Sequence, residues 1–151
     1  PMMRLSELYL NYAEALNEVS GPSLEVYDAM NKIRERAGIP TVQEAWSDVA
    51  YAATPNKHTS KEGLREIIRQ ERMIELAFEG HRYYDIRRWK LAEEYFTTPI
   101  KGWSVNEETE ANYYQVTDVS QRAFNAPRDY LQPISFIELS RNPNLIQNPG
   151  W

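Results

Sequence analysis

Cysteine is absent from the 151 residues, so disulfide bonds and thiolate catalysis are both excluded. There are only two histidines, and neither His58 nor His81 stands in an HExxH, ExxH or Cys/His spacing typical of zinc sites. No glycine-rich loop could cradle a phosphate, and no GxSxG sequence could place a nucleophilic serine. The sequence therefore gives no support for enzymatic activity or for a cofactor, although a calcium site built from oxygen ligands stays open.

Positive charge and long apolar runs are also scarce. The net charge is −5 and no basic stripe exists outside Arg82–Lys90, which weighs against nucleic-acid binding. No stretch approaches the roughly 20 apolar residues that a membrane-spanning helix needs. The first residues have neither the basic start nor the continuous apolar run of a signal peptide, and show helical periodicity instead. We therefore expect that the front of a longer protein is missing.

The bulk composition is that of an ordinary globular protein. Hydrophobic residues make up 42% of the chain and charged residues 26%, which argues against disorder and predicts one domain over residues 1–151. Aromatic residues are the unusual feature, because ten Tyr and four Trp outnumber four Phe. Aromatic side chains with a polar tip suit surfaces that are partly apolar and partly wet, which include binding surfaces.

Apolar residues at helical spacing predict most of the secondary structure. The expected helices are Met3–Val19, Pro22–Ala37, Thr59–Phe78 and His81–Phe96. The short turn between the first two makes them antiparallel neighbours, a pair of the size of one tetratricopeptide unit. The core stripe expected for the first helix consists of Leu5, Leu8, Tyr12, Leu16 and Val19.

The remaining segments are expected to be less regular. Thr41–His58 reads as a long loop, and the chain after Pro99 turns polar and acidic. Tyr113–Thr117 predicts a short strand, and Ser135 starts one last short helix before an irregular tail. The predicted fold class is mainly α, with antiparallel tetratricopeptide-like helix pairs, minor β structure and a long irregular C-terminal segment.

The segment Glu71–Lys90 has the highest density of charge. Glu71 and Glu75 fall in the middle of an apolar stripe, whose other members are Leu64, Ile67, Ile68, Ile74 and Phe78. Two carboxylates cannot be buried there without cations, and the cations expected nearby are Arg82, Arg87 and Arg88. A catalytic carboxylate pair is the alternative, but one turn of the same helix makes both groups face the same way. A structural ion network is the favoured interpretation.

Five aromatic residues lie outside the predicted helices, where a ring is freer to meet a ligand. They are Trp46, Tyr51, Trp103, Tyr113 and Tyr114. A flat ring can stack on the C–H face of a sugar while neighbouring amides and carboxylates bind its hydroxyl groups. Packing is favoured over ligand contact for any single one of them, and Trp46, Tyr51, Trp103 and Tyr113 are the candidate ligand-binding residues.

Four segments in order along the chain resemble the C-terminal region of the SusD/RagB family, the nutrient-binding lipoproteins of the Bacteroidetes outer membrane. They read RLSELYLNYAEALNE, NKIRERAGIP, IIRQERMIELAFEGHRYYDIRRW and YLQPISFIELSRNPNLIQNPGW. The family pattern E-R-x-x-E-L-x-F-E-G-x-R-x-x-D-x-R-R-W falls on Glu71, Arg72, Glu75, Leu76, Phe78, Glu79, Gly80, Arg82, Asp85, Arg87, Arg88 and Trp89. Ser135 departs from the family, which often has proline there.

The resemblance implies a surface-exposed binder of glycans or other nutrients that is not an enzyme. It implies a SusC-like TonB-dependent transporter as partner, and attachment to the outer membrane only through a lipid anchor on an N-terminal part outside this sequence. Much of the family's ligand surface is also built by that part, so no motif transfers ligand residues to this chain. A helical scaffold that binds proteins and no sugar is the alternative function.

Overall fold

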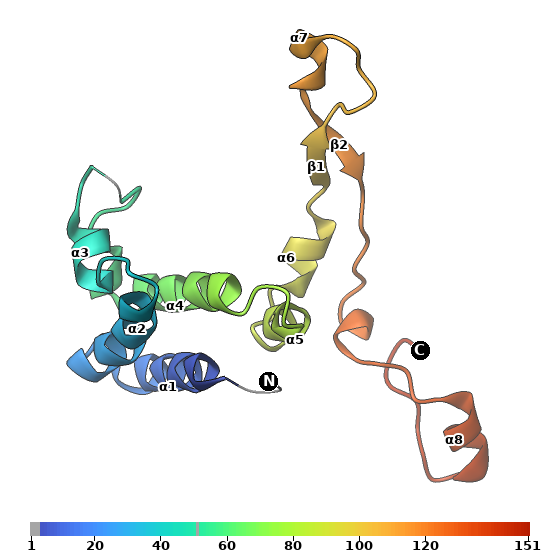
Figure 1. Ribbon diagram of the computed structural model, residues 1–151. Coiled ribbons are helices and arrows are strands. Elements are labelled where there is room, and N and C mark those ends of the chain that lie inside the picture. Colours follow the sequence, from blue (N-terminus) through green and yellow to red (C-terminus); the bar gives the residue numbers. More distant parts are fainter. Residues whose placement is uncertain (1–3, 51) are drawn as a thin grey trace. The chain divides into compact units, whose positions relative to one another are not determined.

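The computed structural model describes residues 4–50 and 52–151 (Figure 1). The chain divides into two compact units, the first ending at Arg82 and the second running from Tyr83 to Trp151. Each unit has a hydrophobic core of its own and is described by itself. That the whole chain forms a single domain stays a prediction.

The first unit is helical, as expected. Its elements are α1 (Leu5–Ser20), α2 (Leu24–Arg36), α3 (Val42–Ser47), the 3₁₀ turn η1 (Lys57–Thr59) and α4 (Lys61–Glu75). Helix α1 packs against both α2 and α4, so three of the predicted helices are confirmed and share one core (Figure 1). The mainly α fold class is confirmed.

Serine hydroxyls set the starts of two helices. The Ser23 hydroxyl accepts a hydrogen bond from the Val26 amide, so α2 begins two residues later than predicted. The Ser60 hydroxyl accepts from the Gly63 amide at 3.1 Å and begins α4. Helix α1 ends before Gly21, which takes a positive φ of 75° that suits glycine.

The core of the first unit lies where the three helices meet. Its main cluster consists of Ala13, Val26, Ala29, Met30, Val42, Leu64, Ile67 and Ile68. Leu10, Ile33 and Leu76 form a second, smaller cluster. The predicted inward positions Leu64, Ile67 and Ile68 of α4 are therefore confirmed, whereas Ile74 and Phe78 are exposed. Helix α4 ends at Glu75, and Phe78 lies beyond it with a φ of 65°.

The predicted core stripe of α1 is wrong. Leu5, Leu8, Tyr12 and Val19 are exposed, and only Leu16 packs partly against the core. The buried face consists instead of Ser6, Leu10, Ala13 and Asn17. Both faces have helical spacing, and periodicity alone does not say which of two faces meets the neighbouring helices.

The predicted loop Thr41–His58 is held at both ends. At its start Thr41 and Glu44 form a capping box, in which Glu44 Oε2 accepts from the Thr41 amide at 2.9 Å, and α3 follows. At its end η1 packs directly on α4 at Gly63. A Cβ atom on Gly63 would lie 2.0 Å from the Lys57 carbonyl oxygen, so this close approach requires glycine.

The second unit contains shorter elements. They are α5 (His81–Arg88, which begins at the end of the first unit), α6 (Ala92–Thr97), β1 (Ile100–Trp103), α7 (Glu110–Tyr113), β2 (Val116–Ser120), the 3₁₀ turn η2 (Arg128–Tyr130) and α8 (Phe136–Arg141). The single helix predicted over His81–Phe96 is broken, because Lys90 takes a φ of 58° and Leu91 donates back to the Ile86 carbonyl. Ile86, Ala92 and Phe124 form the core of this unit.

An antiparallel hairpin carries α7 at its far end (Figure 1). Trp103 in β1 stands opposite Val116 in β2. The strand predicted at Tyr113–Thr117 begins later, because Tyr113 closes α7 before β2 starts. The last helix follows Ser135 as predicted, and the chain from Asn142 onward is irregular.

We predict that the two faces of α1 respond differently to truncation in the 151-residue chain. Leu10→Ala should lower the free energy of unfolding by about 2–5 kcal/mol, because Leu10 is 0% exposed and the change leaves a cavity. Leu5→Ala is the matched control and should cost less than about 0.5 kcal/mol, because Leu5 is 62% exposed. Urea denaturation measures both. Equal losses would contradict the assignment of the buried face.

Candidate functional site

Glu71 is held by an arginine of a neighbouring helix. The Glu71 carboxylate accepts a hydrogen bond from Nη1 of Arg34, near the end of α2. Arg34 is itself buried and donates its Nε–H to the Pro40 carbonyl at 2.6 Å. Burial raises the pKa of Glu71 above its usual value, and the neighbouring Arg34 only partly opposes this rise. Glu71 and Arg34 therefore form a largely buried ion pair between α4 and α2.

Glu75 joins three helices. Its carboxylate accepts from Arg4 Nη1 at 2.8 Å and from Arg36 Nη2 at 2.7 Å, and Arg4 also binds the Glu75 carbonyl. Burial on its own would raise the pKa of Glu75, but the hydrogen bonds around it, including those from Arg4 and Arg36, outweigh burial and lower it. Arg4 Nη2 continues the network to Glu79 at 2.5 Å.

The expected partners of Glu71 and Glu75 need correction. Arg87 stacks on the Tyr83 ring, with 3.6 Å from its Cζ to the ring centroid, and Arg88 Nε donates to Asp85 at 2.9 Å. Arg82 lies in the first turn of α5 and makes an interaction of its own. Proximity along the chain suggested these cations, but packing brings Arg34, Arg4 and Arg36 to the carboxylates instead. Basic residues in the last turn of α2 were the signal for two of them.

Buried ion pairing is what the Glu71–Glu75 arrangement can do. Each carboxylate is bound by guanidinium groups from other helices, and the Glu75 side chain is only 12% exposed. Neither carboxylate lines any of the hollows described for this chain. The contacts support the interpretation of a structural network, now with different cations.

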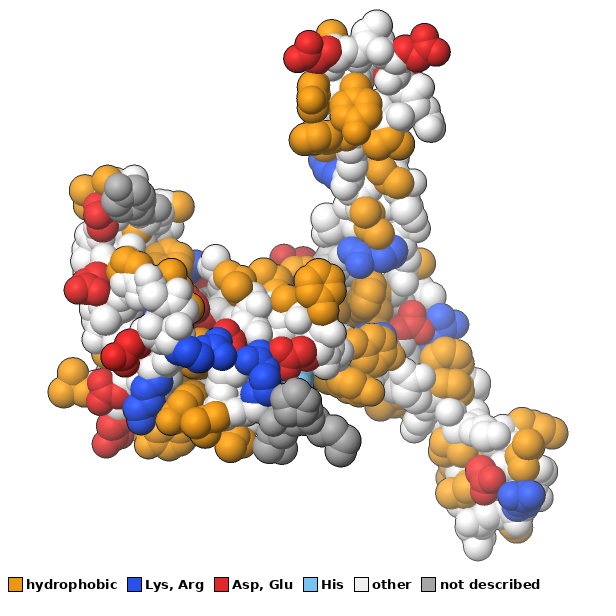
Figure 2. Space-filling model, viewed as in Figure 1, with side chains coloured by type: hydrophobic (Ala, Val, Ile, Leu, Met, Phe, Trp, Pro, Cys, Tyr) orange, Lys and Arg blue, Asp and Glu red, His pale blue; other side chains and the backbone are white. Residues whose placement is uncertain are grey.

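Three aromatic rings cluster where the hairpin meets α7. Trp103 lies 5.0 Å from Tyr114 and 6.0 Å from Tyr113, centroid to centroid, and all three pairs meet edge to face. Trp103 is 52% exposed and Tyr114 55% exposed. Figure 2 shows hydrophobic side chains at the surface of the hairpin and α7. We call Trp103, Tyr113 and Tyr114 the aromatic platform.

The two other predicted ligand-binding aromatics lie elsewhere in the sequence. Trp46 is half-buried in α3 and packs against the main core cluster of the first unit. Lys57 Nζ stands 5.6 Å from the centroid of its ring. This position favours a packing role. Tyr51 lies outside the described residues.

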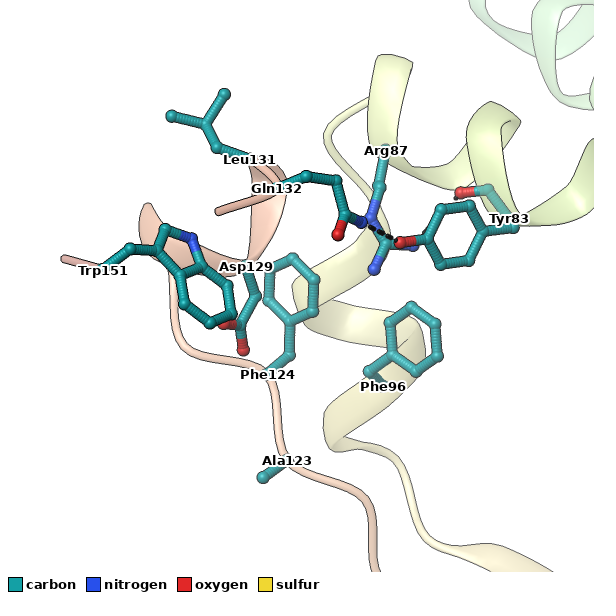
Figure 3. Close-up of a pocket in the computed structure, with 9 residues that line it drawn as sticks. All are labelled: Tyr83, Arg87, Phe96, Ala123, Phe124, Asp129, Leu131, Gln132 and Trp151. Carbon is teal, nitrogen blue, oxygen red and sulfur yellow. Dashed lines mark hydrogen bonds between the residues drawn. The ribbon is translucent and has the colours of Figure 1, made fainter. Parts of the chain in front are cut away.

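A hollow of about 250 Å³ opens in the second unit (Figure 3). In that view Arg87 and Gln132 point toward Tyr83, with the rings of Phe96, Phe124 and Trp151 around them. Gln132 Nε2 donates to the Tyr83 hydroxyl at 2.5 Å. A neighbouring hollow of about 720 Å³ shares Tyr83, Arg87, Leu131 and Gln132 and adds further tyrosine and basic side chains, namely Tyr84, Arg88, Lys90 and Tyr130.

Sequence reasoning missed these two hollows. Tyr84 stands at helical core spacing in the sequence, but it is exposed. Tyr130 and Gln132 stand in a turn and an extended segment that show no periodicity. The only local signal was the density of Tyr and Arg in residues 82–88.

The described residues contain neither a metal-binding cluster nor a membrane-spanning helix. Within residues 4–50 and 52–151, no three His, Asp or Glu side chains gather closely enough to hold a metal ion. No helix in this part of the chain has the length and apolar character needed to cross a membrane.

Known proteins resemble this chain over almost its whole length. The sequence model of the SusD family matches residues 1–151. The chain belongs to the SusD family. Among curated relatives, the SusD-like protein P2 of Formosa agariphila is 39% identical over 150 residues, which are 99% of this chain and 25% of the relative.

Solved structures of SusD-like proteins resemble the chain in fold as well. A SusD-like protein of Bacteroides fragilis is 37% identical, with a TM-score of 0.76 over 99% of this chain and 25% of the other. A second B. fragilis protein, described as a SusD-like carbohydrate-binding protein, is 34% identical, with a TM-score of 0.70 over 93% and 27%. The SusD-family chain therefore spans about a quarter of the length of its relatives.

We predict opposite pH dependences for Glu75 and Glu71. Glu75 has a lowered pKa, so its stabilising contribution is present above its unfolded pKa near 4.5 and is lost as the pH falls through the folded value. Glu75→Gln should therefore cost about 1–3 kcal/mol at pH 7, and this cost should shrink in acid.

Glu71 has a raised pKa, so its contribution declines as the pH rises from the unfolded value through the folded one. The difference in unfolding free energy between the unmodified chain and Glu71→Gln should accordingly fall with rising pH. Urea denaturation at several pH values between 3 and 7 measures both variants. The same slope for the two would contradict the assigned environments.

Proposed function

We propose that the SusD-family chain is part of a cell-surface protein that binds an oligosaccharide and passes it to a SusC-like TonB-dependent transporter. Its role is binding without chemistry on the ligand. The aromatic platform is the observation that carries this proposal.

The aromatic platform offers what a sugar ring needs. Trp103 and Tyr114 each leave about half of their surface in water, although burying an aromatic side chain is strongly favourable. Exposed polar residues flank Tyr113 and Tyr114 in the sequence, among them Glu110, Asn112 and Gln115. Apolar ring faces beside amide and carboxylate groups match the alternating C–H and O–H surfaces of a carbohydrate.

The hollows around Tyr83 and Arg87 are a second region suited to the same ligand. Tyrosine hydroxyls, the Gln132 amide and the guanidinium of Arg87 all provide hydrogen-bonding groups there. The Nε atom of Arg87 is buried and has no hydrogen-bond partner among the described residues. A polar group left in this state is stabilised by a ligand that brings an acceptor.

Family membership supports the partner and the location. One solved relative is described as a carbohydrate-binding protein, which agrees in chemistry with the platform. Delivery to a SusC-like transporter and attachment to the outer membrane extend the family's role to this chain. The attachment would use a lipid anchor on a segment outside these 151 residues, as the resemblance implies.

A helical scaffold that binds proteins and no sugar is the second candidate. The exposed apolar face of α1, with Leu5, Leu8 and Tyr12, favours it. The two functions differ in what the second unit does, because a scaffold has no use for a ring cluster beside polar groups.

We predict that Trp103→Ala weakens glycan binding by about tenfold or more, equivalent to about 1.4 kcal/mol, because it removes the central ring of the platform. Val105→Ala is the control, because Val105 is also exposed and lies two residues after Trp103 but has no ring to stack. Calorimetry of the gene product against a panel of polysaccharides measures both affinities.

Two results would contradict the proposal at different levels. Equal affinities of the unmodified protein and Trp103→Ala would place the sugar elsewhere. A lack of binding across the panel, with retained capture of the transporter in a pull-down, would favour the scaffold function.

A further inference from the structure

The larger hollow of the second unit gathers positive charge, although the chain as a whole carries a net charge of −5. Three cations line it, namely Arg87, Arg88 and Lys90, and no Asp or Glu side chain is among the described residues that line it. Its volume of about 720 Å³ lies in the range of pockets that hold small ligands. We call this space the basic hollow.

The charges of Arg88 and Lys90 differ in how they are balanced. Arg88 Nε donates to Asp85 at 2.9 Å, and Asp85 is buried, so this pair adds no net charge to the hollow. Lys90 Nζ lies 4.1 Å from the centroid of the Tyr130 ring. A ring face attracts an ammonium group without neutralising it. Among residues 4–50 and 52–151, no carboxylate forms an ion pair with Lys90.

Arg87 adds a second charge without a bound carboxylate. Its guanidinium stacks on the Tyr83 ring at 3.6 Å, and its Nη1 donates to the Tyr83 carbonyl at 3.2 Å. Its Nε atom is buried and has no hydrogen-bond partner among the described residues. Asp129 lines the smaller hollow beside Arg87, but its carboxylate pairs with Arg128 Nε at 2.7 Å. Arg87 therefore keeps a charge and a buried donor that a ligand can use.

The polar groups on this wall are mainly donors. The Tyr83 hydroxyl accepts from Gln132 Nε2 at 2.5 Å, so its own hydrogen is available to a further acceptor. Figure 3 shows Arg87 and Gln132 pointing toward Tyr83. The Tyr83 hydroxyl, Arg87 Nε and the Lys90 ammonium together can bind a group that only accepts. A carboxylate or a sulfate is such a group, whereas a neutral sugar hydroxyl both donates and accepts.

We propose that the basic hollow binds the anionic group of an acidic saccharide, either a carboxylate or a sulfate ester. This inference rests on the proposed function, because it takes the ligand to be a saccharide and adds its charge. Hydrogen bonds from Arg87 and Lys90 to an anion are about twice as strong as those between neutral groups. Tyr84, which is 70% exposed and also lines the hollow, offers a ring face to the sugar that carries the anion.

Matched pairs of saccharides test the charge of the ligand on the complete product of the gene. An oligogalacturonate and its methyl ester share one backbone and differ in their carboxylates. A carrageenan oligosaccharide and its desulfated form differ in their sulfate esters. Calorimetry at low and at physiological salt measures the four affinities, and the two pairs distinguish a carboxylate from a sulfate as the anion that is bound.

We expect the acidic form of at least one pair to bind about tenfold or more tightly than its uncharged form. The difference should shrink as salt screens the charges. Lys90→Gln, at an exposed position, should lower the affinity for the acidic form about tenfold. Arg141→Gln is the control and should leave this affinity unchanged, because its side chain is 72% exposed on α8 and lines neither hollow.

Three results would overturn the proposal. Equal affinities for the acidic and uncharged forms in both pairs would leave saccharide binding in place without selection for charge. Binding of neutral polysaccharides but of neither acidic form would do the same. Equal losses in Lys90→Gln and Arg141→Gln would show that only the overall charge of the protein matters. A lack of binding to any saccharide would instead contradict the proposed function itself.

Discussion

The first unit depends on neutralising two carboxylates that its own packing removes from water. Glu71 and Glu75 stand on the part of α4 that turns toward α1 and α2, where an unpaired charge would cost several kcal/mol. The guanidinium groups that meet them come from the beginning of α1 and the end of α2. The packing of these three helices therefore brings a cation to each of the two carboxylates.

The sequence predicts the positions of the helices well. It predicts poorly which face of a helix is buried and which residues meet in the folded chain. Capping chemistry and apolar spacing locate the first three helices within a few residues, because these signals are local. The inward face of α1 was wrong because that helix has two apolar faces, and the cations of the ion network were wrong because they arrive through tertiary packing. The break at Lys90 has no residue-type signal, since lysine seldom takes a positive φ.

In the candidate site, too, local features were predictable from the sequence and tertiary contacts were not. Trp103 and Tyr113 were found as aromatics outside helices, and the hairpin brings them together with Tyr114 into one cluster. Their meeting depends on the pairing of β1 with β2, a contact over more than ten residues that weak alternation did not locate. None of the three rings belongs to the ion network of the first unit.

The contact between Gly63 and the Lys57 carbonyl has a consequence for how this chain can vary. Because the capping box at Thr41 fixes one end of the long loop and the glycine contact fixes the other, neither end can shift along the helices. We therefore expect changes in length to be tolerated only between these fixed ends, in the segment that joins α3 to η1. A change in length there would leave the two fixed ends, and so the helices that they join, in place.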